Sequence, residues 1–436
     1  MKKKVPVVTV AEPEEAANLA GLPVEATIAL ADMAAALKEG LLGFSADVGL
    51  AMMTEVMVAE LTSRVGPKHA KLPGRTANWH GTTTGPAVLG GRTVSVERPR
   101  ARTVDGREVE LESWSVFSSR DLLNQLTVER MLAGVATRRH DDVEPSLGAA
   151  VDERSKATGR SSVSRRWVRA TERALAELMA RDLSGLEVAV VMIDGIEIVG
   201  QCCVVAMVIC TDGTKVPVGL WLGDTENKTV VTNLLADLVA RGLSAEGGLL
   251  VVIDGAKALA AGVRRVFGEH ALVQRCTLHK RRNVADHLPD ELARSVDWRL
   301  ARAFNHPNPA RGLDAARRLA GELRADHPDA AASLLEGLED MFTVRRLGVS
   351  GRLALTLTTT NPIESMISVS RTVTGRVKRW KDGSMKKRWV AAGMLEAERS
   401  FRRVKGCKEM PTLVAALRRH AARVDVTPSC ENQEAA

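Results

Sequence analysis

The sequence contains no tyrosine. Its 436 residues include only seven tryptophans and six phenylalanines, so aromatic side chains make up 3% of the chain. A DNA-joining enzyme that attacks with a tyrosine hydroxyl needs that nucleophile. The absence therefore excludes tyrosine recombinases, tyrosine topoisomerases and rolling-circle relaxases.

Cysteine and long apolar runs are also scarce. The six cysteines show no framework spacing, which favours reduced thiols over disulfides. The longest apolar run, Ile198 to Cys210, is interrupted by Gln201 and is shorter than the ~20 residues that span a bilayer. Near the start of the chain, acidic residues follow a very short apolar run, unlike in a signal peptide. We therefore expect a cytoplasmic protein without a membrane partner.

Positive charge is concentrated in one stretch. The chain has 61 basic and 53 acidic residues, a surplus of +8, which suggests a polyanionic partner such as nucleic acid. Between Glu364 and Lys405 there are 12 basic and 4 acidic residues, which gives the same surplus (12 − 4 = +8). A phosphate-binding cluster is therefore predicted there: Arg376, Lys378, Arg379, Lys386, Lys387 and Arg388.

The N-terminal part is predicted to be mainly helical, with helices over Val24–Leu37 and Ala46–Val65. Residues 86–111 alternate between apolar and polar side chains and contain an Asp105-Gly106 turn signal, which predicts a small basic β ribbon. Its arginines form either a solvated face or a surface for DNA phosphates.

Further helices are expected over Asp121–Arg139, over Ser146–Ala157 and from Ser161 onward. The short turn around Gly159 between the last two suggests a helix-turn-helix DNA reader. Its second helix would present Arg165, Arg166 and Arg169 to DNA, although arginines on an exposed helix face are common.

From Leu186 the pattern changes to three apolar strands followed by helix, strand, helix and strand. This order predicts an α/β fold with a ribonuclease-H-like mixed sheet flanked by helices. The predicted domains are residues 1–115 (helices and ribbon), 116–183 (helix-turn-helix-like), 184–275 with 355–405 (catalytic core), 276–354 (helical insertion) and 406–436 (helix and polar tail).

Asp194 and Asp254 each follow an apolar strand within an Ile-Asp-Gly triplet. Neighbouring strands would bring the two carboxylates together, and oxygen ligands suit a hard cation such as Mg²⁺. The alternative is that Asp-Gly only ends each strand. Glu364 likewise has two interpretations, because Asn361, Pro362 and Glu364 also form a capping-box pattern at a helix start.

Four segments resemble the Mutator-type transposases of bacterial insertion sequences. They are VVMIDGIEIVG around Asp194, LLVVIDGAKAL around Asp254, QRCTLHKRRNVADHLP around Cys276 and His279, and TTNPIESMISVSR around Glu364. The intervals of 60 and 110 residues between the three acidic residues suit an Asp-Asp-Glu triad with a helical insertion before the glutamate.

The resemblance implies DNA transposition with Asp194, Asp254 and Glu364 holding two Mg²⁺ ions, with Mn²⁺ as the expected substitute. The partners would be double-stranded DNA (transposon ends and target) and further copies of the chain, at least a dimer. It also implies that His279 and Arg282, together with Lys280 and Arg281, contact DNA near the cut phosphate. Cys276 is a structural candidate, and Cys276 with His279 is only half of a zinc site.

Two other functions remain open from the sequence. One is a non-catalytic DNA-binding protein derived from a transposase. The other is an actin-like-fold ATPase or kinase, which also begins with three strands and a strand-end aspartate. That fold needs a second lobe with glycine-rich phosphate loops, and TDGTK at Thr211–Lys215 is only a faint match.

Overall fold

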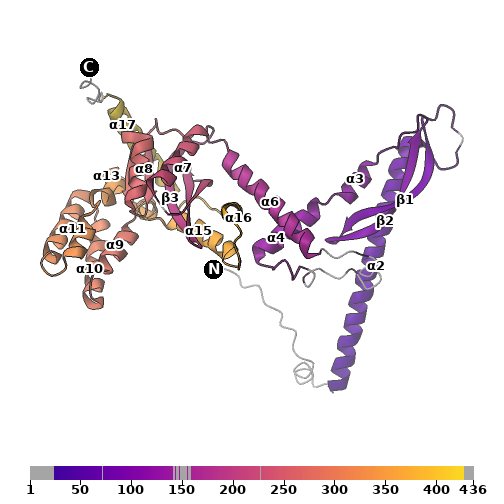
Figure 1. Ribbon diagram of the computed structural model, residues 1–436, viewed down its shortest axis with the longest axis horizontal. Helices are drawn as coiled ribbons and strands as arrows, with labels where there is room; N and C mark the ends of the chain where they lie inside the picture. The colour runs from indigo at the N-terminus through magenta and orange to yellow at the C-terminus, as the bar shows by residue number, and fades with distance from the viewer. Residues whose placement is uncertain are drawn as a thin grey trace. The chain divides into compact units, whose positions relative to one another are not determined.

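The computed structural model describes residues 24–70, 72–140, 143, 147, 155, 159–225 and 227–426, with only the backbone of residues 24–39. Contacts divide the chain into two compact units, residues 1–168 and 169–436. Figure 1 labels many of the helices and strands of both.

The first unit is built on one long helix, α2 (Val24–Val65), instead of the two that were predicted. Gly40 and Gly43 lie inside α2 without ending it, since a helix tolerates a glycine at a cost of about 1 kcal/mol. Met57, Leu61 and Val65 on α2 are buried against the β ribbon. The other helices are α3 (Glu112–Ser118), α4 (Asp121–Ala133) and the start of α6 (Arg160–Ala180).

The β ribbon begins earlier than predicted, with β1 (Ala77–Leu89) antiparallel to β2 (Arg92–Thr103). Gly90 and Gly91 connect the strands, and both have positive φ angles (56° and 87°), as a tight hairpin requires. The predicted Asp105-Gly106 turn is present, but it leads only to a single bridge between Arg102 and Glu108.

The predicted helix over Asp121–Arg139 is α4, which ends earlier because Gly134 adopts a left-handed conformation. The first helix of the predicted helix-turn-helix, Ser146–Ala157, lies outside the described residues apart from Leu147 and Ser155. Its second helix is α6, on which Val163 and Trp167 are buried, as predicted.

The second unit contains a five-stranded mixed sheet in the order β5-β4-β3-β6-β7. Its strands are β3 (Val188–Ile198), β4 (Gln201–Cys210), β5 (Lys215–Gly223), β6 (Leu249–Ile253) and β7 (Ala271–Arg275). The first three pair antiparallel, whereas β3–β6 and β6–β7 pair parallel. The mixed α/β class and the order of elements are confirmed.

Helices cover both faces of this sheet, and side chains of β4 alternate between the two. Cys203, Val205 and Met207 pack on the face covered by α14 (Gly351–Leu357), α15 (Asn361–Thr374), α16 (Gly383–Arg399) and α17 (Met410–Val426). Val204, Ala206 and Val208 pack on the face covered by α7 (Lys228–Ala240) and α8 (Lys257–Phe267). A strand buried on both faces reads as an unbroken apolar run, which is why these strands were recognisable from the sequence.

Between β7 and α14 lies a helical segment with its own apolar core around Leu300, Leu334 and Phe342. It contains α9 (Thr277–Ala285), α10 (Asp290–Phe304), α11 (Pro309–Leu323), α12 (Pro328–Leu335) and α13 (Thr343–Arg346). Short 3₁₀ turns are η2 (Gly268–His270), η3 (Glu339–Phe342) and η4 (Cys407–Glu409).

One stretch of α2, Gly40–Val65, is long and apolar enough to cross a membrane by length and composition. Only 11% of its most apolar window is buried inside the protein, and Leu41, Phe44 and Met52 are exposed. A single helix of this kind also occurs in proteins that never enter a membrane, so the expected absence of a membrane partner stays a prediction.

Candidate functional site

Asp194 lies inside a strand and not at its end, which corrects the sequence-based expectation. β3 continues to Ile198, and Asp194 pairs with Val205 of β4. On the other side of β3, the pairing with β6 stops at Met192. The Asp194 carboxylate therefore lies beside the place where β6 ends, and its Oδ1 accepts a 2.8 Å hydrogen bond from the Gly195 amide.

Asp254 follows β6 directly, as predicted. Its Oδ1 accepts a 2.8 Å hydrogen bond from the backbone amide of Ala256. The Cys276 amide donates to the Ile253 carbonyl at 2.7 Å, which holds the start of α9 against the same strand end. Since β3 and β6 are parallel neighbours, both aspartates lie at one edge of the sheet.

Glu364 comes to this edge on the first turns of α15, but not as the predicted capping residue. Thr360, and not Asn361, is the N-cap of α15. In a capping box the glutamate would accept from the N-cap amide, yet the Thr360 amide donates to Cys276 Sγ at 3.4 Å. The Glu364 side chain instead accepts a 2.5 Å hydrogen bond from the Thr360 hydroxyl.

Asp194 interacts electrostatically with Asp254, His279 and Glu364. Burial, together with the negative charges of Asp254 and Glu364, raises the pKa of Asp194 to about 6, against the Gly195 hydrogen bond and the charge of His279. A carboxylate that is buried beside two others is costly without a cation.

Cys276, His279 and Thr360 form a polar cluster behind Glu364. The hydroxyl of Thr360 lies 3.3 Å from both Cys276 Sγ and His279 Nδ1, and His279 Nδ1 lies 3.9 Å from Glu364 Oε1. The Cys276 side chain, with the charges of Glu364 and Asp254, raises the pKa of His279 to about 9 despite its partial burial. This raised pKa favours the protonated form of His279 at neutral pH.

Within the described residues, one group of His, Cys and acidic side chains is gathered closely enough to hold a metal ion. Donor atoms of Cys276, His279 and Glu364 lie within 4.8 Å of one another, but a zinc site needs a fourth ligand or a water. Asp194, Asp254 and Glu364 offer oxygen atoms only, which suit Mg²⁺ or Mn²⁺. These three carboxylates are not gathered as closely as Cys276, His279 and Glu364, so a divalent ion shared by them stays a prediction.

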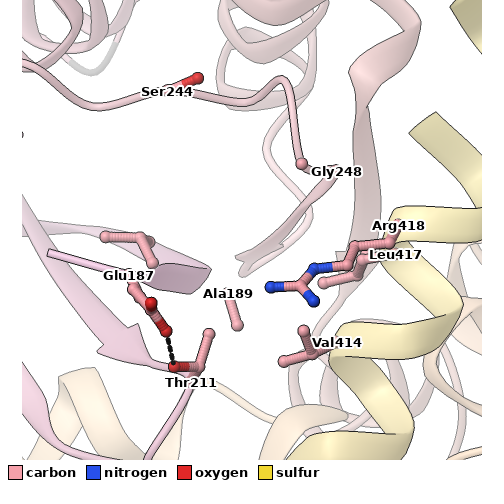
Figure 2. Close-up of a pocket in the computed structure, with 10 residues that line it drawn as sticks. Glu187, Ala189, Thr211, Ser244, Gly248, Val414, Leu417 and Arg418 are labelled. Atoms are coloured by element: carbon pink, nitrogen blue, oxygen red, sulfur yellow. Dashed lines mark hydrogen bonds between the residues drawn. The ribbon is translucent and has the colours of Figure 1, made fainter. Parts of the chain in front are cut away.

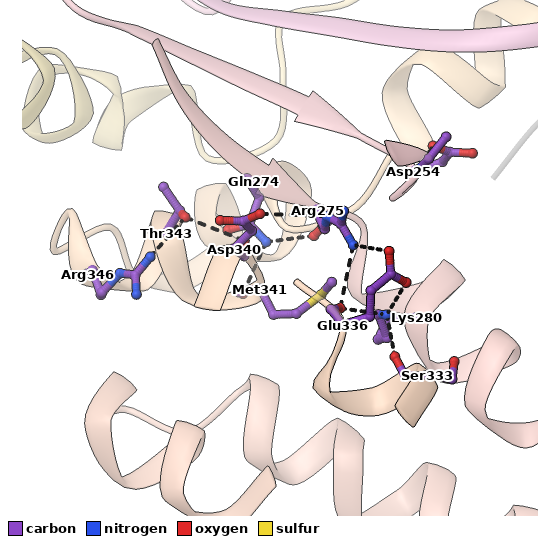
Figure 3. A network of polar contacts seen from close by, with 11 residues as sticks. Asp254, Gln274, Arg275, Lys280, Ser333, Glu336, Asp340, Met341, Thr343 and Arg346 are labelled. Atoms are coloured by element: carbon purple, nitrogen blue, oxygen red, sulfur yellow. Dashed lines mark hydrogen bonds and ion pairs between the residues drawn. The ribbon is translucent and has the colours of Figure 1, made fainter. Parts of the chain in front are cut away.

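Two cations of α9 that were predicted to touch DNA are structural, which corrects that prediction. The Lys280 ammonium is buried and donates to the carbonyls of Ser333 and Glu336 at 2.6 and 2.8 Å. Arg281 pairs with Asp297 through two hydrogen bonds of 2.7 and 2.5 Å. Figure 3 shows Lys280 within the network that joins α9 and β7 to the end of α12 and to η3. Arg282 is exposed.

The residues of the predicted phosphate-binding cluster differ in their burial and in their hydrogen-bond partners. Lys386 is buried and donates to the Val199 carbonyl and to Gln201 Oε1, both at 3.0 Å. These bonds hold the β3–β4 turn. The prediction that Lys386 contacts a phosphate is therefore wrong. Arg388 donates to the hydroxyl of Thr171 on α6 at 2.8 Å.

The remaining predicted contacts lie nearer the surface. Lys387 is half-buried beside a pocket of about 370 Å³. The exposed ones are Arg376, Lys378, Arg379, Arg165 and Arg169, whereas Arg166 is half-buried. Their predicted contacts with DNA stay predictions.

A pocket of about 180 Å³ opens near the start of β3 (Figure 2). Glu187 and Arg418 are its charged lining residues, and Glu187 is engaged by the Thr211 hydroxyl at 2.9 Å. It lies toward the end of β3 remote from Asp194 and gathers no comparable set of reactive groups. The carboxylate cluster is therefore the candidate functional site.

Thr360 is the residue of the site that sequence reasoning missed. It is fully buried and contacts Cys276, His279 and Glu364 through one hydroxyl. The signal available in the sequence was its place four residues before Glu364, one helical turn away.

Two similarities to known proteins accompany this geometry. The family model described as "Transposase, Mutator family" matches residues 24–403. A probable transposase for an insertion sequence element from Corynebacterium diphtheriae is 26% identical over 220 residues. That match covers 49% of this chain and 62% of the relative, so the chain spans under two thirds of the relative's length.

Proposed function

Because this chain belongs to the Mutator family of transposases, we propose that it cuts DNA at the ends of an insertion sequence and joins the cut 3′ ends to target DNA. The chemistry would be metal-dependent phosphoryl transfer at Asp194, Asp254 and Glu364. The observation that supports the proposal is the parallel pairing of β3 and β6, which puts Asp194 and Asp254 at one edge of the sheet; Asp194 also interacts electrostatically with both Asp254 and Glu364.

The fold supports the proposal. Three antiparallel strands followed by two parallel ones, in the order β5-β4-β3-β6-β7, are the arrangement expected of a ribonuclease-H-like core. In that arrangement the first strand of the sheet lies beside the fourth. Here these strands are β3, which contains Asp194, and β6, which Asp254 directly follows. The helical segment between β7 and α14 then corresponds to the insertion before the glutamate.

Each step of the reaction exchanges one phosphorus–oxygen bond for another. In cleavage, a water oxygen attacks the phosphorus and the bond to the 3′ oxygen breaks, which leaves a 3′-hydroxyl and a 5′-phosphate. In strand transfer, that hydroxyl attacks a target phosphodiester and releases a target 3′-hydroxyl. Two Mg²⁺ ions, when bound, would activate the attacking oxygen and stabilise the leaving one.

In this proposal the side chains of the protein bind the metal ions and orient the DNA. Asp194, Asp254 and Glu364 supply the oxygen ligands, and the Thr360 hydroxyl fixes one oxygen of Glu364. His279, 3.9 Å from Glu364, would contact the phosphate that is cut. No tyrosine is needed, because the nucleophiles are water and a DNA hydroxyl.

Double-stranded DNA is the proposed partner, in keeping with the family. Exposed cations between Arg376 and Arg379, with Arg282 on α9, would contact its phosphates. Two DNA ends must be brought together before both are joined to one target, so we expect at least a dimer on DNA and a location at the nucleoid.

Cleavage of DNA that carries the element's ends tests this function. Wild-type protein with Mg²⁺ is expected to nick at the element boundary and leave a 3′-hydroxyl, whereas Asp194→Asn and Glu364→Gln bind the same DNA without nicking it. A wild-type protein that binds ends and never nicks them would instead be a non-catalytic DNA-binding protein. ATP hydrolysis without DNA would favour the actin-like ATPase.

A further inference from the structure

A pocket of about 900 Å³ lies beside the first turn of α15, outside the predicted phosphate-binding cluster. It is lined by residues from the start of β5, from α14, from the first turn of α15 and from the segment after α16. Five of the lining residues are cations: Lys215, Arg352, Arg402, Arg403 and Lys405.

The charge of this pocket is mostly uncompensated. Within the described part of the chain no acidic residue lines it. Asp212, outside the lining, pairs with Arg403 at 3.1 Å. No described carboxylate lies within 4.0 Å of the charged groups of Arg352, Arg402 or Lys405. Like charges gathered without counterions repel one another, so the pocket gains by taking up an anion.

Lys215 shows that one of these cations is partly withdrawn from water. Its ammonium lies 4.5 Å from the centre of the Phe401 ring, and burial lowers its pKa from the ordinary value. A desolvated ammonium interacts more strongly with an anion than one in bulk water. Lys215 also projects from β5 of the sheet, which holds it in place.

The shape and the neutral lining suit a strand and not a single small anion. Leu355, Pro362 and Val404 supply apolar surface, while Asn361 and Ser365 supply polar groups at the α15 N-terminus. A positively charged surface that follows the backbone is one part of how proteins hold a nucleic-acid strand. A volume of this size lies at the upper end of ligand pockets, at roughly 300–1,000 Å³.

The pocket adjoins the candidate site through one helix. Ser365 lines the pocket and follows Glu364, whose side chain faces Thr360 and His279. Consecutive residues of a helix point about 100° apart, so the pocket lies on a neighbouring face of the same turn. A strand in the pocket would pass close to the reacting phosphate.

We infer that this pocket is a second DNA-backbone site, which binds a strand next to the one being cut. The inference rests on the proposed function. The recognised chemistry is the phosphodiester backbone, supplied either by the flank of the transposon end or by the target DNA.

The test compares Arg402→Ala/Lys405→Ala with a matched control that removes two exposed cations from α11 and the residue after it, Arg311→Ala/Arg324→Ala. Affinity for duplex DNA is measured over a range of salt concentrations, followed by end cleavage and by strand transfer of pre-cleaved ends. The pocket variant is expected to bind DNA about tenfold more weakly. Its salt slope, the slope of log affinity against log salt concentration, should be smaller in magnitude by about one to two. The control should behave as wild type.

The cleavage and strand-transfer assays distinguish the two sources of DNA. Loss of cleavage assigns the pocket to the transposon end, and loss of strand transfer alone assigns it to the target. The charge-conserving variant Arg402→Lys/Lys405→Arg should retain binding, and Arg402→Gln/Lys405→Gln decides the question if the alanine variant does not fold. Affinity and slope equal to wild type, or an equal loss in the control, would overturn the inference. A wild type that binds DNA but never cuts it contradicts only the proposed function.

Discussion

The hydroxyl of buried Thr360 donates a 2.5 Å hydrogen bond to Oε1 of Glu364, one helical turn further along α15. The same hydroxyl lies 3.3 Å from Cys276 Sγ and from His279 Nδ1. Thr360 therefore connects the Cys-x-x-His segment of α9 to a proposed metal ligand, and it fixes the direction in which that carboxylate points.

Thr360→Val is expected to lower DNA cleavage by about 10- to 100-fold, because valine keeps the shape of threonine but leaves Glu364 without its hydrogen bond. Thr360→Ser keeps the hydroxyl and should retain most activity. Cleavage rate as a function of Mg²⁺ concentration is the measurement, and Thr360→Val should need more metal. If both variants show the wild-type metal requirement, the hydroxyl does not position Glu364.

Asp194→Asn is expected to stabilise the metal-free protein at neutral pH. The folded pKa of Asp194, about 6, is above its ordinary value of 3.8, so the ionised form costs free energy in the folded state. That cost is absent below about pH 4, grows as pH rises through 6 and is complete above it. Asp194→Asn removes this cost. The variant should therefore gain about 1–2 kcal/mol in free energy of unfolding, or roughly 2–6 °C in melting temperature.

Melting curves with EDTA at pH 7.5 and pH 4 check this prediction. The advantage of Asp194→Asn should be present at pH 7.5 and vanish at pH 4, where both side chains are uncharged. A variant less stable than wild type at pH 7.5 would show that Asp194 is not crowded by the other carboxylates.

Much of the second unit could be predicted from the sequence because the strands of its sheet are buried on both faces. Unbroken apolar runs gave the order of elements, and the aspartate after Ile253 follows β6 as expected. The continuation of β3 past Asp194 was missed, since Ile196 and Ile198 alternate with Gly195 and Glu197 in a segment that pairs with β4 alone beyond Met192.

The roles of single cations could not be predicted in the same way. Lys280 and Lys386 stand within basic runs, which favours a DNA-binding surface. Both are buried because distant backbone carbonyls accept from their ammonium groups, those of Ser333 and Glu336 for Lys280 and that of Val199 for Lys386. Such partners are set by tertiary packing, which no local pattern reports.

Lys386 and its exposed neighbours in sequence should therefore respond differently to substitution. Lys386→Met leaves the Val199 carbonyl and the Gln201 side chain without their donor, which should cost about 1–3 kcal/mol of folding stability. Lys378→Ala/Arg379→Ala should leave the melting temperature unchanged but lower the salt slope of DNA binding by about one to two. A double variant with wild-type affinity and slope would remove this cluster from the DNA surface.

Removal of divalent metal should stop cleavage without releasing DNA. With EDTA the protein is expected to bind end DNA and leave it uncut, since phosphate contacts come from side chains while cleavage needs the carboxylate-bound ions. Mg²⁺ or Mn²⁺ should restore cutting. Gel assays of binding and nicking on one substrate measure both, and undiminished nicking in EDTA would rule out this chemistry.

The most direct measurement is a crystal structure of the protein with end DNA and Mn²⁺, in which anomalous scattering locates the metal. The account predicts anomalous peaks bound by oxygen atoms of Asp194, Asp254 and Glu364, next to the phosphate at the element boundary. A metal held by Cys276 and His279, or carboxylates that bind none while DNA is in place, would contradict it.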